Sequence, residues 1–432
     1  MAARIESIGR GAEVRNAGFG LVGAAAIALL APPPAQAGDL PASPRYVKAC
    51  KLDSPGFYQV PGTDTCLRIG GYQWAEGYYN SYTDYPQQND TSYAIATLGL
   101  QMDARSQTEY GTLRSFIDLR FQWRGSDPWS DAPEHTVVQP WNFYIQFNGF
   151  TFGYDQSFFD FYDNQDVLGT DPATISDNVQ TLLAAYTWSL ANGYSATLSL
   201  EDASEREAGV AFADPTASDA DDSPASLARL PDIVANFGQS ADWGQFQLSA
   251  ALHEVSATGG NGSTLSVSDW GYALQAGVMF NLPAIAGGDT LYIEGAYVDG
   301  AVSYLGLVNA SGDFAPPDAY LSADGSLSRV SGWNIVGQYR HNWNATWNSA
   351  VFGGYARFDI NDSVAQAAYG ASGGTNYNVG ANVTWTPVAP LAFTVQYDFN
   401  VYAARDWRPT GLGLPVTSQA AHQLLLMVAR TF

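Results

Sequence analysis

The sequence predicts an all-β protein, a 16-stranded antiparallel transmembrane β-barrel with short periplasmic turns and long external loops. Three observations lead to this fold class. Segments of about ten residues alternate apolar with small or polar side chains, connections alternate between short and long, and the ionic residues of a strand share one face. No helical periodicity is sustained along residues 65–432, and a period of two is the signature of strands.

The composition excludes other classes of protein. The chain has 432 residues, of which 46% are hydrophobic and 13% aromatic, so it has enough apolar surface to fold. Only 19 Lys and Arg stand against 42 Asp and Glu, a charge of −23, which disfavours a nucleic-acid partner because phosphate recognition depends on basic side chains. Beyond residue 37 no run approaches the roughly 20 apolar residues that a membrane-spanning helix needs.

Residues 1–37 are predicted to be a signal peptide. A basic region with three Arg precedes the apolar stretch 17–31, and Ala35–Ala37 has the small-x-small pattern of a cleavage site. A buried N-terminal helix is the alternative, but the three Pro at 32–34 would end it. Cleavage would remove three Arg and two Glu, leaving 16 basic against 40 acidic residues and a charge of −24.

Residues 38–64 are the predicted N-terminal mature segment, which leads into the barrel at 65–432. Cys50 and Cys66 are the two cysteines of the chain. Export to an oxidising compartment makes a disulfide between them the expectation, and two reduced buried thiols are the alternative. A zinc site is excluded because it needs about four ligands and no His lies nearby. We predict no metal and no cofactor.

The barrel region contains sixteen segments with the period of two. They are Thr65–Tyr79, Leu98–Ser106, Thr112–Arg124, Trp141–Asn148, Phe150–Ser157, Gln180–Leu190, Tyr194–Glu201, Arg229–Phe237, Gly244–His253, Trp270–Asn281, Thr290–Val298, Gly332–Arg340, Thr346–Phe358, Tyr377–Trp385, Leu391–Tyr402 and Gln419–Phe432.

The lengths of the connections favour an outer-membrane barrel over a soluble sandwich. The short connections include 107–111, 148–149, 191–193, 238–243, 282–288, 341–344 and 387–390. The long ones run roughly over 80–91, 125–135, 158–179, 202–228, 254–268, 299–328, 359–375 and 403–418. In a barrel of this kind every second connection is a tight periplasmic turn, whereas a sandwich has no reason to sort its loops by strand parity.

Two neighbouring segments show how the faces are expected to divide. One face of 112–124 carries Leu113, Ile117, Leu119, Phe121 and Trp123, and the other carries Arg114, Phe116, Asp118, Arg120, Gln122 and Arg124. Segment 141–148 is expected to repeat this, with Trp141, Phe143, Ile145 and Phe147 toward lipid. A charge that faces lipid costs roughly 2–4 kcal/mol near the midplane, so the ionic face must line a wet lumen.

Several stretches are similar to a known family. CKLDSPGFYQVPGTDTCLRIGGY at 50–72, TEYGTLRSF at 108–116, YIQFNGFTFGYDQSFFDFYDN at 144–164 and the terminal ARTF resemble the alphaproteobacterial general-diffusion porins of the rhizobial and Brucella type. The likeness runs in the same order over nearly the whole mature chain. It implies a homotrimer, a third external loop folded inward as a constriction, and an assembly signal at Phe432 that the barrel-assembly machinery reads.

The resemblance also implies the residues of the constriction. The inward loop would be 158–179, whose acidic residues include Asp160, Asp163, Asp166 and Asp171 and which has no basic residue. On the opposite wall, strand parity places five basic residues in the lumen, namely Arg68, Arg105, Arg114, Arg120 and Arg124. The alternative for any of these residues is a rim salt bridge or a solvated loop surface.

The predicted function is a water-filled porin channel in the Gram-negative outer membrane. Small hydrophilic solutes and ions would diffuse through it passively, with a weak preference for cations because the chain is acidic. Its partners would be outer-membrane lipid and lipopolysaccharide. Four scattered His and the lack of a catalytic motif argue against an enzyme. A substrate-specific outer-membrane channel is the nearest alternative, and a secreted all-β binding protein is a more distant one.

Overall fold

The structure is a computed structural model. It describes residues 50, 56–83, 91–125, 134–162, 166–168, 179–213, 225–226, 229–258, 266–306, 315–322, 324–408 and 417–432. The predicted signal peptide, Asp163 and Asp171 lie outside the described residues.

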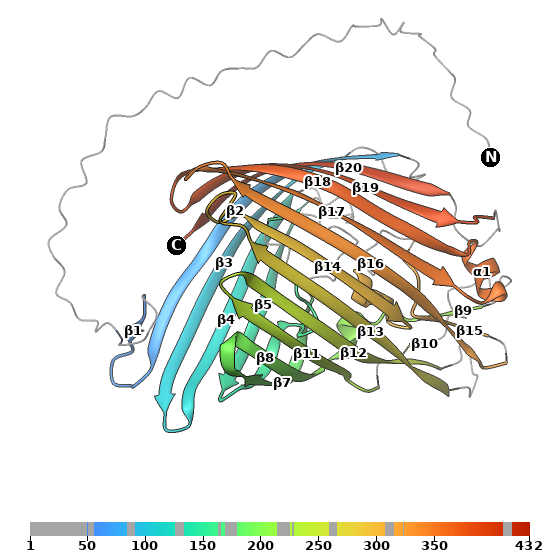
Figure 1. The fold of residues 1–432 in the computed structure, drawn as a ribbon, viewed down its shortest axis with the longest axis horizontal. Helices are drawn as coiled ribbons and strands as arrows, with labels where there is room; N and C mark the ends of the chain where they lie inside the picture. Colours follow the sequence, from blue (N-terminus) through green and yellow to red (C-terminus); the bar gives the residue numbers. More distant parts are fainter. Residues whose placement is uncertain are drawn as a thin grey trace, which may run out of the picture. The chain divides into compact units, whose positions relative to one another are not determined.

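Sixteen long strands of the described chain form one closed antiparallel barrel (Figure 1). They are β2 (Cys66–Thr83), β3 (Thr91–Thr108), β4 (Gly111–Gly125), β5 (Glu134–Phe147), β6 (Phe150–Gln156), β7 (Gln180–Ser189), β8 (Tyr194–Glu201), β11 (Asp232–Ala241), β12 (Gly244–Thr258), β13 (Ser266–Asn281), β14 (Thr290–Asp299), β16 (Leu327–Asn342), β17 (Trp347–Ile360), β18 (Gly373–Val388), β19 (Leu391–Arg405) and β20 (Ser418–Thr431). Each pairs with its neighbours along the chain, and β2 pairs with β20, which closes the ring. All sixteen predicted segments fall on these strands.

Shorter elements lie between the barrel strands. They are the strands β1 (Tyr58–Gln59), β9 (Val210–Phe212), β10 (Ala225–Ser226) and β15 (Ala319–Leu321), the 3-10 helices η1 (Ala191–Gly193), η2 (Ala203–Arg206) and η4 (Val302–Leu305), and the helix α1 (Ser363–Tyr369). β9 pairs in parallel with β15, which in turn pairs with β16, so two long connections share a small sheet. Among the described residues no helix is long and apolar enough to cross a bilayer.

The connections alternate in length as predicted, with one exception. Tight turns at 109–110, 148–149, 190–193, 242–243, 343–346 and 389–390 alternate with longer connections along the chain. The exception is 282–289, whose eight residues are one more than in the connections 84–90 and 259–265. The chain also ends beside these turns, where Phe432 exchanges two backbone hydrogen bonds of 2.9 and 3.0 Å with Gly71. The last residue therefore continues the closing ladder between β2 and β20.

The connection 282–289 is fixed by a buried carboxylate. Asp289 is 1% exposed and accepts hydrogen bonds from the Asn342 amide at 2.8 Å and the Tyr339 hydroxyl at 2.9 Å, and Nδ1 of His341 lies 2.7 Å away. Burial raises the pKa of Asp289, but the hydrogen bonds from Asn342, His341 and Tyr339 outweigh burial and leave the pKa below its usual value.

The barrel has an apolar outside and a polar inside. On β4, Leu113, Ile117 and Trp123 are 38–43% exposed. Asp118, which lies on the opposite face of the same strand, is 4% exposed. Buried polar side chains recur on other strands, as at Thr97. This is the reverse of a soluble protein, in which apolar side chains fill the core, and it confirms the predicted faces of 112–124.

The predicted face of Trp141 is wrong. A β-bulge in β5 shifts the register between the pairs Asp118–Asn142 and Leu119–Pro140, so Trp141 is the extra residue. Such a residue no longer obeys strand alternation. Trp141 therefore turns to the lumen, where the Arg120 guanidinium carbon lies 3.5 Å from its ring centre.

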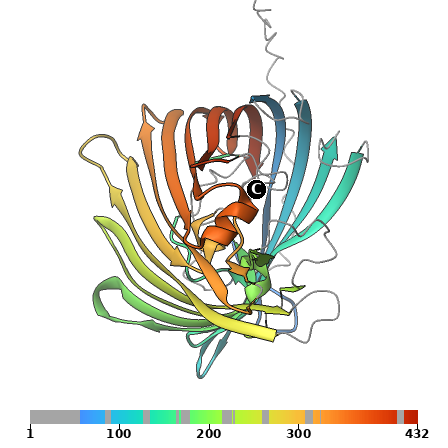
Figure 2. The same ribbon diagram turned by 90° about the vertical axis from the view of Figure 1, so that its right-hand side faces the viewer.

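Long connections fill part of the barrel interior and form an apolar core there together with inward-facing strand residues such as Val234 and Phe358. Buried members include Phe159 from the third connection, Tyr304 and Leu305 from η4, and Ala365 and Tyr369 from α1. Figure 2, which views the end that carries the long connections, shows α1 within the outline of the ring of strands. The remaining free lumen must then lie beside the strands that this core does not cover.

Candidate functional site

The third long connection, residues 157–179 and here called the inner loop, folds into the barrel as predicted. It starts at Ser157, whose hydroxyl donates to Oε2 of Glu201 on β8 at 2.6 Å, while the Phe158 amide donates to Oε1 at 3.0 Å. Asn236 on β11 and Gln247 on β12 then donate to backbone carbonyls of the loop. These bonds satisfy loop backbone groups that would otherwise be buried without partners.

The inner loop continues along the wall formed by β13 to β19. Phe161 packs over Gly277 on β13, where a Cβ atom would come within 2.2 Å of its ring. The Tyr162 amide donates to Glu294 on β14 at 2.9 Å. Further on, the Leu168 amide donates to Gln396 on β19 at 2.9 Å. The described residues of the loop therefore contact the inner wall at points between β8 and β19.

Asp160, an expected acidic residue of the constriction, lies in a buried ion pair. Its Oδ1 is 2.5 Å from Nη2 of Arg206 in η2, and the two side chains are 0% and 2% exposed. Its Oδ2 accepts from the Val179 amide at 3.3 Å, so this carboxylate connects both ends of the inner loop. The Arg206 guanidinium carbon also lies 4.5 Å from the ring centre of Tyr304. Arg206 lies in a loop without periodicity, so sequence parity gave no signal for it.

Asp166 is also paired with an arginine that sequence reasoning did not single out. Its Oδ1 accepts from Nη1 of Arg340 on β16 at 3.0 Å, and its Oδ2 accepts from Gln338 at 2.7 Å. The side chain of Arg340 is 36% exposed, so this pair borders open space. The position of Arg340 on the lumen face could have been found by extending the parity argument to the later strands.

Three of the five predicted basic residues gather on one carboxylate. Arg105 and Arg114 contact Asp103 at 2.7 and 3.1 Å, and Arg68 lies 3.6 Å from it. Asp103 on β3 is 1% exposed. The guanidinium groups of Arg68 and Arg105 also lie 5.1 and 4.8 Å from the ring centre of Phe57. This cluster lies at the end of the barrel where the tight turns are, because Arg105 and Arg114 flank the turn 109–110.

The other two basic residues, Arg120 and Arg124, lie farther up the same wall and form no ion pair with a described residue. Among the described residues, neither Arg120 nor Arg124 has a carboxylate oxygen within the 4.0 Å that defines an ion pair. Arg120 donates from Nε to the Tyr72 hydroxyl at 2.6 Å, and Arg124 donates to Gln122 at 2.5 Å.

The strand order places the inner loop across the lumen from this basic wall. β2 to β4 lie on the part of the ring across from β13 and β14, along which the inner loop runs. The arrangement places arginines on one side of the lumen and a loop with acidic residues on the other. Whether both rows line the narrowest section stays a prediction.

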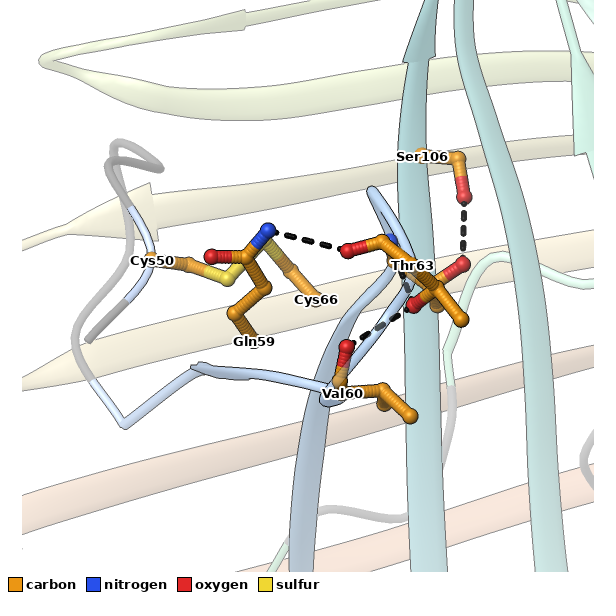
Figure 3. The surroundings of a disulfide bond; sticks show 7 residues. Cys50, Gln59, Val60, Thr63, Cys66 and Ser106 are labelled. Atoms are coloured by element: carbon orange, nitrogen blue, oxygen red, sulfur yellow. Dashed lines mark hydrogen bonds between the residues drawn. A yellow bond between two sulfur atoms is a disulfide. The ribbon is translucent and has the colours of Figure 1, made fainter. Parts of the chain in front are cut away.

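The predicted disulfide is present at the entrance to β2. Cys50 and Cys66 are bonded, with their Cα atoms 5.9 Å apart, and β1 pairs with the start of β2 (Figure 3). The Thr65 and Ser106 hydroxyls lie 3.0 Å apart and connect this segment to β3. The disulfide thus ties the N-terminal segment to the rim of the barrel. The described residues contain no group of three or more His, Cys, Asp or Glu that could hold a metal ion.

Comparison with known proteins adds a family and a fold. The sequence profile of the porin subfamily matches residues 39–422. The porin Omp2b of Brucella suis is 28% identical over 313 residues, which cover 68% of this chain and 77% of that protein. The crystal structure of the outer-membrane channel DcaP of Acinetobacter baumannii superposes with a TM-score of 0.66 at 15% identity, over 85% of this chain and 97% of that one. The latter likeness concerns the fold.

Proposed function

This chain belongs to the porin subfamily and is an outer-membrane porin channel, and on this basis we propose how it selects what passes. Small hydrophilic solutes and ions diffuse passively through a water-filled lumen, with a weak preference for cations. The observation that carries this proposal is the division of the barrel interior. Folded loops cover the wall from β8 to β19, while the wall of β2 to β5 presents polar and charged side chains that no described inner-loop hydrogen bond covers.

The charges of the lumen support a weak rather than a strong ion preference. The two described acidic residues of the inner loop, Asp160 and Asp166, are each neutralised by an arginine. The transverse field between loop and wall is therefore weaker than unpaired rows would give. The preference for cations then depends on the excess of 40 acidic over 16 basic residues in the predicted mature chain. Because the Debye length is about 8 Å at physiological salt, this excess acts mainly near the channel mouths.

A reversal-potential measurement tests this proposal. Purified protein in a planar bilayer under a KCl gradient should give discrete, ohmic channels. Their reversal potential should have the sign that cation selectivity gives and a small magnitude. Neutralising Asp163, which lies outside the described residues, should shift the potential toward the anion side, and Asp163→Glu should not. A firm anion preference of the unmodified channel would contradict the proposed selectivity, and a lack of channels would contradict the proposed function.

A trimer is proposed as the form of the channel in the membrane, among outer-membrane lipid and lipopolysaccharide. On the outer face, Ala75 of β2 pairs directly with Ala96 of β3. These small residues line a hollow of about 500 Å³ whose other lining includes Phe121, Trp123 and Val428. A second copy could fill such a hollow with larger side chains. Filling it with Ala96→Trp should reduce the detergent-extracted mass to that of one chain, while the same bulk at Val351 on β17 should leave the mass unchanged.

Assembly by the barrel-assembly machinery is proposed to use the C-terminal aromatic residue. Phe432 is 58% exposed and lies at the end of the closing strand pair. Deleting Phe432 should lower the amount of folded protein in the outer membrane, whereas Phe432→Tyr should not. Equal amounts for both variants would contradict this role.

A further inference from the structure

Four residues on the lumen wall form a cluster of aromatic rings around one guanidinium group. The rings of Tyr72 and Trp74 on β2 are stacked with centres 4.6 Å apart and planes 9° apart. The guanidinium carbon of Arg120 lies 3.5 Å from the ring centre of Trp141 and 5.4 Å from that of Trp74. We call these four residues the Arg120 cluster. The bulge in β5 completes it by turning Trp141 inward.

The backbone beneath the cluster is shaped to hold it. Tyr72 lies directly over Gly99 of β3, where a Cβ atom would come within 2.1 Å of the phenol ring. The Tyr72 hydroxyl accepts from Nε of Arg120 and donates to Asp118 at 3.1 Å. Asp118 also accepts from Gln101 at 2.9 Å and is 4% exposed. The orientation of the guanidinium group is therefore fixed through a buried carboxylate that it does not touch.

Arg120 differs from the arginines lower on this wall in that it shares no carboxylate with them. Arg68, Arg105 and Arg114 share Asp103, whereas no described carboxylate oxygen lies within ion-pair distance of Arg120. Its hydrogen bond to the Tyr72 hydroxyl uses Nε, and its two terminal amino groups donate to no described residue. A guanidinium group whose terminal N–H groups are available binds a carboxylate through two parallel hydrogen bonds.

The chemistry on both sides of Arg120 favours one class of solute. Aromatic side chains prefer flat partners in offset or edge-to-face contact, and such contacts exclude water from the adjacent charge pair. We infer that the Arg120 cluster is a binding subsite for carboxylates that carry a flat apolar ring. The carboxylate pairs with the terminal amino groups of Arg120, and the ring lies against Trp74. This inference rests on the proposed channel function and adds one binding step to passive diffusion.

Block of the ionic current measures such a step. Single-channel current of the purified protein in KCl is recorded with increasing benzoate, with acetate as a carboxylate without a ring and benzamide as a ring without a charge. Benzoate should reduce the current in a saturable way at a concentration about tenfold below that needed for acetate or benzamide, which corresponds to about 1.4 kcal/mol. Glucose as a fourth probe tests whether the rings serve a neutral sugar instead.

Two variants locate the block. Arg120→Gln should raise the half-blocking concentration of benzoate about tenfold toward that of acetate, and Trp74→Ala should raise it severalfold. Arg68→Gln is the matched control, because it removes the same charge from the same wall but from the Asp103 group. Folding of each variant is checked by its thermal unfolding in detergent.

Each outcome decides a separate point. Channels of normal conductance in which benzoate and acetate block equally, or in which Arg68→Gln has the effect expected of Arg120→Gln, overturn the subsite. A stronger block by glucose than by benzoate overturns the assignment of the solute class. If the unmodified protein gives no channels, it is the proposed function that fails.

Discussion

The buried pair between Asp160 and Arg206 offers the sharpest perturbation of the inner loop. Nη2 of Arg206 lies 2.5 Å from Oδ1 of Asp160, and both side chains are at most 2% exposed. A second carboxylate, that of Glu201, lies near this pair. It accepts hydrogen bonds from Ser157 and Phe158, which precede Asp160 in the loop. Arg206→Ala therefore leaves two buried carboxylates beside a cavity without a cation. Removing one partner of such a pair costs about 3–5 kcal/mol.

This cost should appear first in the docking of the loop. At 1.4 kcal/mol per factor of ten, a loss of 3 kcal/mol shifts the equilibrium between docked and undocked loop by roughly a hundredfold or more. The barrel ladder does not depend on this pair, so we expect channels that still insert but show larger conductance and more current noise. Single-channel recording measures both, and thermal unfolding in detergent reports the remaining barrel.

A double variant separates the pair from simple loss of packing. Replacing a buried ion pair by apolar residues of similar volume often leaves the stability unchanged. Asp160→Leu combined with Arg206→Met should therefore show less current noise than Arg206→Ala alone. The reasoning is refuted if Arg206→Ala shows the conductance and noise of the unmodified channel.

Two further variants test the packing of the loop and the stability of a turn. Gly277→Ala places a Cβ atom where an aromatic ring of the inner loop now lies, so it should lower the stability of the docked loop by about 1–3 kcal/mol and raise the current noise. Gly337→Ala is the control, because the nearest atom to its added Cβ would be 3.6 Å away, and it should leave both quantities unchanged. Asp289 has a lowered pKa in the folded protein, so its contribution is present above the unfolded value of about 3.9 and is lost as the pH falls through the lower folded value. The urea concentration at the midpoint of unfolding should therefore fall over this acid range in the unmodified protein. The Asp289→Asn variant should be less stable at neutral pH, and its midpoint should fall less over the same range. If the midpoints of both proteins fall in parallel with pH, the role assigned to Asp289 is contradicted.

The barrel was predictable from sequence because its physics is periodic. Each strand must present one face to lipid and one to water, so Leu113 and Arg114 in neighbouring positions already report the two sides. The presence of two cysteines, Cys50 and Cys66, in a chain predicted to be exported was enough to predict their disulfide. These features depend on local pattern and on the compartment, both of which a single sequence records.

The interior was less predictable because its contacts are not periodic. One extra residue in β5 reversed the face of Trp141, since a shift by one position exchanges the two sides of a strand. Arg206 pairs with Asp160 across 46 positions from a loop with no alternation. The parallel pairing of β9 with β15 likewise joins two connections that nothing in their sequences relates. Asp160 and Asp166 of the expected acidic row pair with Arg206 and Arg340, which are not among the five arginines that strand parity selected.

Cysteine accessibility tests the central claim that water and solutes pass beside the wall of β2 to β5. The two native cysteines are bonded to each other, so an added cysteine is the only reactive thiol. A charged methanethiosulfonate reagent should lower the conductance of Gln122→Cys, on the lumen face of β4, and should leave Phe121→Cys, on its lipid face, unchanged. Gln396→Cys beneath the inner loop, at a position now 1% exposed, should react slowly. A conductance drop in Phe121→Cys or Gln396→Cys with none in Gln122→Cys would contradict this account.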